Sequence, residues 1–313
     1  MQNIYESSAN SKAKSNIIVA GFTVFALLAS YFLSLALSYY LFGFFDGLFT
    51  FGLALIITGI STFGSYYYSD KIIVGISGAR RADSRTNKLF YQVMDNLCLG
   101  VNLPRPALYI IEDTAMNAFA AGRDPTHSLV CATTGLLASL DRTELEAVLA
   151  HELTHVKNYD TRLMSLAAVM VGSITLMADW LLRIGLHTRR NKDSGIGIIT
   201  LVLGIAAALL APIIGQLLQL AISRSREYMA DVGSVKITRQ PGGLISALTK
   251  IDHDLERLEA ANKSTAHLYF TNPFHQDSSY KATFNRPGID WFAGLFNTHP
   301  PIADRIKALS QMS

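Results

Sequence analysis

The residues best suited to do chemistry lie in one short segment, His151-Glu152-Leu153-Thr154-His155. Residues four positions apart share one face of a helix, so the imidazoles of His151 and His155 can bind one metal ion. Glu152 lies next to His151 and can take a proton from a water molecule on that ion. This HExxH arrangement is typical of zinc peptidases, and it predicts a catalytic metal site.

A catalytic zinc ion usually has three protein ligands and keeps a fourth position for water. The extended HExxHxxGxxH form is absent here, because Lys157-Asn158-Tyr159-Asp160 follows the second histidine. Glu227 is the candidate third ligand, and Asp231 follows it by one helical turn. A carboxylate at Asp231 can accept the outer N–H of a ligand histidine and so fix its orientation. The sequence therefore predicts one Zn²⁺ per chain, bound by His151, His155 and Glu227 and supported by Asp231.

These side chains need helices that bring them together. Asp141 and Glu144 have the spacing of a capping box, which predicts a helix from Asp141 to about residue 158 that carries the HExxH segment. We expect this helix to continue through Lys157–Arg162 into the next apolar segment. Other expected elements are helices over 82–98, 224–232, 244–261 and 300–309, strands over 107–111, 117–121 and 128–133, and an irregular loop over 271–298.

The composition excludes several classes of protein. Charged residues are only 16% of the 313, against about 25% in an ordinary soluble domain, and 50% are apolar. A disordered chain would show the opposite balance. The net charge of +3 is too small for a dedicated nucleic-acid-binding protein, so no nucleic-acid partner is expected. Two cysteines cannot form a disulfide framework.

Charged residues are nearly absent from four apolar segments. Each segment has at least the length of about 20 residues that a membrane-spanning helix needs. The first two form a predicted transmembrane hairpin over 16–68, broken at Asp46. Basic residues flank this hairpin but are absent from its loop, so the positive-inside rule places residues 70–160 in the cytoplasm. A basic loop between the other two segments leaves open whether 163–182 and 194–223 both span, and the role of Asp179 stays open too.

Four motifs together resemble the HtpX-type membrane zinc metalloproteases, which are related to the CAAX prenyl endopeptidases. Asn117–Gly122 is similar to the family's NAFATG segment, with Ala121 in place of threonine, and Ser225–Asp231 is similar to its SREYxAD segment. The HExxH segment and Thr298-His299-Pro300-Pro301 match two further motifs. The resemblance covers most of the chain, but residues 274–296 have no counterpart in it.

The resemblance implies a mainly α protein, with integral membrane helices and a zincin-like cytoplasmic metalloprotease domain that has a small β-sheet. The expected parts are an N-terminal tail (1–15), the transmembrane hairpin (16–68), the first part of the catalytic domain (69–160), two further hydrophobic segments (161–223) and the second part of the catalytic domain (224–313). It also implies two further roles. Asn117, on an edge strand exposed to substrate, would bind an extended peptide. His299 would donate a hydrogen bond to the tetrahedral oxyanion.

The expected activity is endopeptidase cleavage of misfolded or damaged membrane proteins at the bacterial inner membrane, as part of protein quality control and the stress response. A zinc-activated water would attack the peptide bond, with Glu152 as general base. A processing peptidase with the same chemistry, such as one that trims prenylated tails, is an alternative. A non-catalytic zinc-binding membrane scaffold is another, although Glu152 would contribute nothing to a purely structural site.

Overall fold

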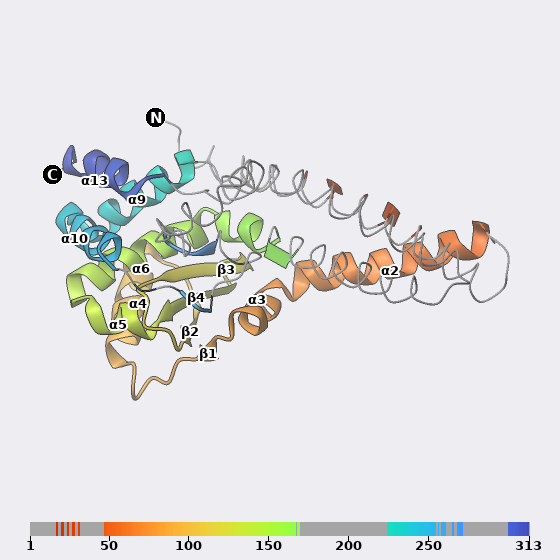
Figure 1. The fold of residues 1–313 in the computed structure, drawn as a ribbon, viewed down its shortest axis with the longest axis horizontal. Coiled ribbons are helices and arrows are strands. Elements are labelled where there is room, and N and C mark those ends of the chain that lie inside the picture. Colours follow the sequence, from red (N-terminus) through yellow and green to blue (C-terminus); the bar gives the residue numbers. More distant parts are fainter. Residues whose placement is uncertain are drawn as a thin grey trace, which may run out of the picture.

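Most of the residues described in a computed structural model fold around one small sheet (Figure 1). The structure describes residues 47–166, 168–169, 224–254, 256, 258–260, 265, 268–271 and 300–312, with isolated positions between 17 and 31. Its helices are α2 (Gly47–Tyr67), α3 (Ser69–Ser77), α4 (Lys88–Val101), α5 (Thr134–Ser139), α6 (Arg142–Lys157), α9 (Arg224–Thr238), α10 (Pro241–Asp252) and α13 (Ile302–Ser310). Its strands are β1 (Arg80–Arg81), β2 (Ala107–Ile111), β3 (Ala118–Asp124) and β4 (His127–Thr133). The predicted combination of a mainly helical protein with a small sheet is therefore confirmed.

The four strands lie in the order β1-β2-β4-β3. The β2–β4 pair is parallel, whereas β1 and β3 each pair antiparallel with their neighbours. Strand β3 comes last in this order, so it is an edge strand. It lies beside α6 (Figure 1). This order brings β3 next to the helix that carries the HExxH segment.

Both faces of the sheet are buried, which explains why its strands read as continuous apolar runs. Alternate residues of β4 serve different cores: Val130 and Ala132 pack with α4, α6 and α10, whereas Leu129 and Cys131 pack with α3 and the helical residues after α6. This two-residue alternation is the geometry of a β-strand with helices on either side.

Helix α6 is the central element, since it contacts α4, α9, α10 and β3. The predicted capping box is present at its start: the Glu144 backbone N–H donates to Asp141 Oδ1 at 2.9 Å, and the Asp141 N–H donates to Glu144 Oε2 at 2.8 Å. Glu144 also accepts hydrogen bonds from Ser246 and Lys250 of α10. One side chain therefore both starts α6 and ties it to a neighbouring helix.

Several expected boundaries are wrong: the helix expected over 224–232 continues to Thr238, and three other differences have a structural reason. The predicted helix over 82–98 begins only at Lys88, because Ala82 donates its N–H to Leu108 O and the residues before it pair as β1. The helix expected over 244–261 ends at Asp252. Beyond it, the Asp254 carboxylate accepts the backbone N–H of Met116 at 2.6 Å, which draws the chain away from the helix axis.

The third wrong expectation concerns the end of the HExxH helix. Helix α6 does not continue through Lys157–Arg162: it ends at Lys157, and a new helical segment begins at Asp160. Between them Tyr159 has a φ of 62°, in the left-handed region. The chain therefore changes direction immediately after the second histidine.

The predicted transmembrane segments are covered only in part. Helix α2 projects from the body of the protein (Figure 1) and exposes large apolar side chains, including Ile56, Ile60 and Phe63. Within the described part of the chain, no helix meets the length and hydropathy required of a membrane span. Most of residues 16–46, nearly all of 161–223 after the first few residues, and Asp179 lie outside the described residues.

Candidate metal centre

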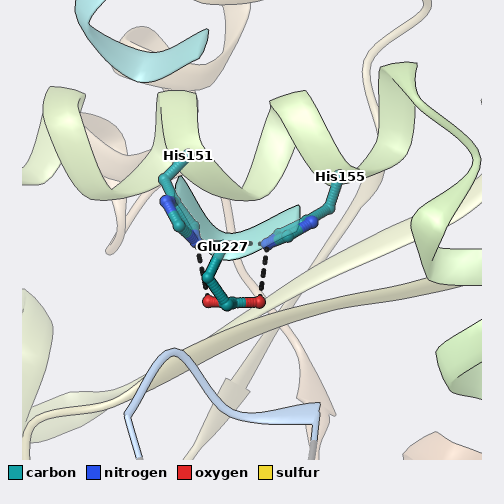
Figure 2. A group of neighbouring side chains, drawn as sticks. All are labelled: His151, His155 and Glu227. Atoms are coloured by element: carbon teal, nitrogen blue, oxygen red, sulfur yellow. Dashed lines mark hydrogen bonds and ion pairs between the residues drawn. The ribbon is translucent and has the colours of Figure 1, made fainter. Parts of the chain in front are cut away.

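The two histidines of the HExxH segment project from one face of α6 (Figure 2). Their Nε2 atoms lie 3.1 Å apart, and the two rings meet edge to face with centroids 4.8 Å apart. Both side chains are buried. The helical spacing of four residues therefore points both ring nitrogens at one position, as the sequence predicts.

Glu227 reaches the same position from the first turn of α9. Its carboxylate oxygens lie 3.7 Å from His151 Nε2 and 3.6 Å from His155 Nε2, so that it faces both rings (Figure 2). One ligand atom from each of the three residues lies within 4.8 Å of the others. The structure thus brings the three predicted ligands together from two helices that are far apart in the sequence.

Close packing of α9 on α6 makes this approach possible. At Gly233 a Cβ atom would overlap the side chain of Thr154, so only glycine lets the two helices lie this near. One residue later, Ser234 Oγ donates to Ala147 O at 2.6 Å and anchors α9 on α6. These two contacts, about two turns along α9 from Glu227, fix how closely the helix that carries Glu227 packs on α6.

The geometry of the three side chains fits a zinc ion. In each ligand histidine, Nδ1 faces a carboxylate, which can only accept, so Nδ1 carries the proton and Nε2 presents a lone pair. The two Nε2 atoms lie 3.1 Å apart and both face the Glu227 carboxylate, so one cation can be bound by all three side chains. Ligand atoms placed tetrahedrally at about 2.0–2.1 Å from Zn²⁺ are about 3.3 Å apart, close to the spacing here, and two His with one Glu is a known catalytic zinc set.

Asp231, the predicted supporting residue, lies behind His151, and Arg305 of α13 bonds to it. Asp231 Oδ1 lies 3.0 Å from His151 Nδ1. Arg305 donates to both oxygens of Asp231, from Nε at 2.9 Å and from Nη2 at 2.6 Å. Burial raises the pKa of the Asp231 carboxyl, but the Arg305 guanidinium and the bond to His151 outweigh it and lower that pKa to about 2. The carboxylate therefore stays ionised behind its histidine.

His155 has an equivalent partner in Asp160, which the sequence analysis did not identify. Asp160 Oδ2 lies 3.3 Å from His155 Nδ1, and Asp160 Oδ1 lies 3.7 Å from Arg226 Nη1. Burial lowers the pKa of His155, whereas the bond to Asp160 and the charges of Glu227, Asp160 and Glu152 raise it to about 9. The site thus attracts positive charge at the position where a metal ion would sit.

Glu152, the candidate general base, lies on α6 between the two histidines and is only 2% exposed. Its negative charge raises the pKa of His155 and of Arg305. A carboxylate at this depth, beside two metal-binding imidazoles, is suitably located to exchange a proton with a metal-bound ligand.

Asn117 lies immediately before edge strand β3, but it is not exposed as expected. It is 3% exposed, and its Nδ2 donates to Thr271 O at 3.1 Å. Beside it, Phe270 N donates to Ala118 O at 2.7 Å, so residues 270–271 already cover this end of the edge. The predicted role of Asn117 in binding substrate stays a prediction, and His299 lies outside the described residues.

Sequence reasoning also missed Arg226 and Arg305. The signals in the sequence are weak. Asp160 lies five positions after the end of the HExxH segment, and Arg226 precedes the candidate third ligand. Arg305 lies in an amphipathic helix, where a charged residue usually faces solvent. Both arginines are buried, and both face carboxylates behind a metal-binding histidine.

Comparison with known proteins places this site in context. Residues 84–313 match peptidase family M48. The chain is 39% identical to a protease HtpX homolog of Dictyoglomus thermophilum over 311 residues, which cover 98% of this chain and 94% of that protein. It is 37% identical to a protease HtpX homolog of Streptococcus pneumoniae over 297 residues, covering 91% and 95% of the two chains. A Tropheryma whipplei protease HtpX homolog is 40% identical over 247 residues, covering 79% and 80%.

Proposed function

This chain belongs to peptidase family M48 and is a metalloprotease, and from that premise we propose that it is a zinc-dependent endopeptidase whose ligands are His151, His155 and Glu227. One observation carries the proposal. Two imidazole nitrogens and one carboxylate converge within 4.8 Å in a buried site, and Glu152 is buried on the same helix. This is the donor set of a catalytic rather than a structural zinc site.

Each of the chain's own groups then has a defined task. When bound, zinc lowers the pKa of a coordinated water and polarises the scissile carbonyl. Glu152 accepts the proton of the attacking water at its carboxylate and passes it to the leaving amine. Asp231 and Asp160 hold the two ligand imidazoles with Nδ1 protonated, so that Nε2 of each ring faces the metal.

The proposed substrates are misfolded or damaged membrane proteins, and the proposed location is the bacterial inner membrane with the catalytic domain facing the cytoplasm. The four apolar segments of the sequence and the exposed apolar side chains of α2 support this proposal. Lipid would therefore be the second partner of the chain, beside its protein substrates. The proposed mode of recognition is pairing of an extended peptide with edge strand β3, which contacts α6, beyond the end of the strand that residues 270–271 cover.

The test compares casein cleavage by the detergent-purified wild type and by Glu152→Gln, each stripped with a chelator and then resupplied with Zn²⁺. We expect the wild type to cut only with zinc, and the variant to bind zinc while losing about 10²–10⁴-fold in rate. Full activity of Glu152→Gln would refute the assigned base. Zinc binding without cleavage of any unfolded protein by the wild type would instead favour a narrowly specific processing peptidase.

A further inference from the structure

The turn between α6 and the next helical segment places a carboxylate behind the second metal ligand. Helix α6 ends at Lys157, and the Asn158 N–H still donates to Thr154 O at 2.9 Å. Tyr159 then adopts a φ of 62° and donates its N–H to Val156 O at 3.2 Å. Helical geometry resumes at Asp160.

An uninterrupted helix could not make this contact. Asp160 lies five positions after His155, which corresponds to about 500° of rotation and leaves the two side chains about 140° apart around the axis. Only residues three or four positions apart meet on a helix surface. In the structure, Asp160 Oδ2 nevertheless lies 3.3 Å from His155 Nδ1, with Asp160 1% exposed. The turn at Tyr159 is what brings the carboxylate to the imidazole.

The partners of Asp160 connect it to the rest of the site. Its other oxygen, Oδ1, lies 3.7 Å from Nη1 of Arg226, and Arg226 precedes the ligand Glu227 on α9. Glu227 Oε1 in turn lies 3.6 Å from His155 Nε2. His155 therefore has a carboxylate facing each of its ring nitrogens, Asp160 from the turn and Glu227 from α9.

We propose that Asp160 is a positioning residue for the metal ligand His155, and that the left-handed backbone of Tyr159 is what positions Asp160. This inference rests on the proposed zinc site. A carboxylate on Nδ1 fixes the tautomer and the ring plane of a ligand histidine and makes Nε2 more basic. A left-handed φ at a residue with a Cβ atom is strained, and such strain persists where the surrounding contacts demand it. Here the contact that requires the strained backbone is the one between Asp160 and His155.

The first experiment measures the zinc affinity of the purified full-length protein by equilibrium competition with a chromogenic chelator. We expect Asp160→Asn to weaken zinc affinity about 10–100-fold, and Asp160→Glu to restore part of it. The matched control is Asp124→Asn: Asp124 also pairs with an imidazole, His127 Nδ1 at 2.9 Å, but on the exposed β3–β4 turn. That variant should retain zinc like the wild type. Wild-type zinc affinity in Asp160→Asn would overturn the inference.

A second pair of variants tests the turn itself. Tyr159→Gly and Tyr159→Ala lose the same ring and differ only by the Cβ atom, so their comparison isolates the left-handed backbone. We expect the glycine variant to retain zinc more tightly than the alanine variant. The corresponding pair at Arg239, whose φ is 57° at the end of α9, should differ in melting temperature but not in zinc affinity. Equal zinc affinity of the two Tyr159 variants would overturn the role of the turn.

One further variant separates this inference from the proposed function. His155→Ala should lose zinc whether or not Asp160 positions the ring. If His155→Ala retains zinc, the metal site itself is wrong. If it loses zinc while Asp160→Asn does not, only the role of Asp160 fails. Melting temperatures of the zinc-free proteins complete the test: an effect of Asp160→Asn on zinc affinity that merely follows a general loss of stability would contradict positioning.

Discussion

Arg305 donates two hydrogen bonds to Asp231, although the two residues are 74 positions apart in the sequence. The guanidinium is completely buried, and its Nη1 also donates to Phe270 O at 3.2 Å. Because Asp231 in turn bonds to His151, the last described helix, α13, reaches the metal centre through a single carboxylate. The stability of the domain and its affinity for metal should therefore both depend on Arg305.

Replacing Arg305 by Met removes the partner of a buried carboxylate. We expect a loss of about 3–5 kcal/mol in the free energy of unfolding, because breaking a buried ion pair leaves one charge uncompensated. Urea denaturation measures this loss. The matched control is Arg105→Met: Arg105 donates to both oxygens of Asp95, but that pair is about half exposed. The control should lose at most about 1 kcal/mol, and equal losses in the two variants would contradict the argument.

The carboxyl of Glu144 should make the free energy of unfolding depend on pH. Burial raises the pKa of this carboxyl, but the bonds from Lys250 and Ser246 and from the Asp141 N–H outweigh it and lower the pKa below its usual range. The folded pKa lies below the unfolded value of about 4.3, so Glu144 stabilises the protein above that pH. This contribution is lost as pH falls through the folded pKa, because the unfolded chain then binds the proton first.

The free energy of unfolding should therefore fall less steeply below about pH 4.3 in Glu144→Gln than in the wild type. Denaturation between pH 3 and pH 7 measures the two slopes. The variant should also be less stable than the wild type at pH 7. Glu146→Gln, on the outer side of α6, is the control and should follow the wild-type profile. If the free energy of unfolding falls equally steeply with pH in Glu144→Gln and in the wild type, the lowered pKa of Glu144 is contradicted.

Removal of zinc should lower the melting temperature of the wild type, and this effect should depend on the three ligands. At a zinc concentration of about 100 times the dissociation constant, binding adds about 2.7 kcal/mol to the stability of the folded state. We expect chelator to remove this gain from the wild type and to change Glu227→Gln much less. Glu112→Gln serves as the control, because Glu112 pairs with Arg80 on the surface. Calorimetry with and without zinc makes the comparison. If chelator lowers the melting temperature of Glu227→Gln as much as that of the wild type, Glu227 is not a ligand.

Gly233 should set the spacing of the two helices that carry the ligands. Gly233→Ala puts a methyl group into the side chain of Thr154, so we expect α9 to move away from α6 and zinc affinity to fall. Thr154→Ala in the same chain makes room for that methyl group and should restore part of the affinity. Gly100→Ala is the control: its Cβ meets nothing within 4 Å, and alanine in a helix is about 0.5–1 kcal/mol more stable than glycine. Failure of Thr154→Ala to rescue zinc binding would exclude the spacing argument.

The local features of the site follow from the sequence alone. The spacing of His151 and His155 and the capping box of Asp141 and Glu144 lie within one helix, where distance along the chain fixes distance in space. Glu227 was found by a chemical requirement, since a catalytic zinc needs a third ligand. The small sheet was predicted from short apolar runs, but the two-residue strand β1 was not, because it exists only through its pairing with β2.

Tertiary structure decided the supporting groups. Asp160 reaches His155 because the backbone of Tyr159 is left-handed. The residue types around Tyr159 do not predict a positive φ at this non-glycine position. Arg305 reaches Asp231 because α13 packs against α9 and α10, and in sequence it looks like the polar face of an amphipathic helix. Helical periodicity fixes contacts within a few turns. Contacts between distant segments depend on how whole elements pack, as Arg305 and Asp231 show, whereas the contact of Asp160 with His155 depends on a backbone conformation that residue types do not reveal.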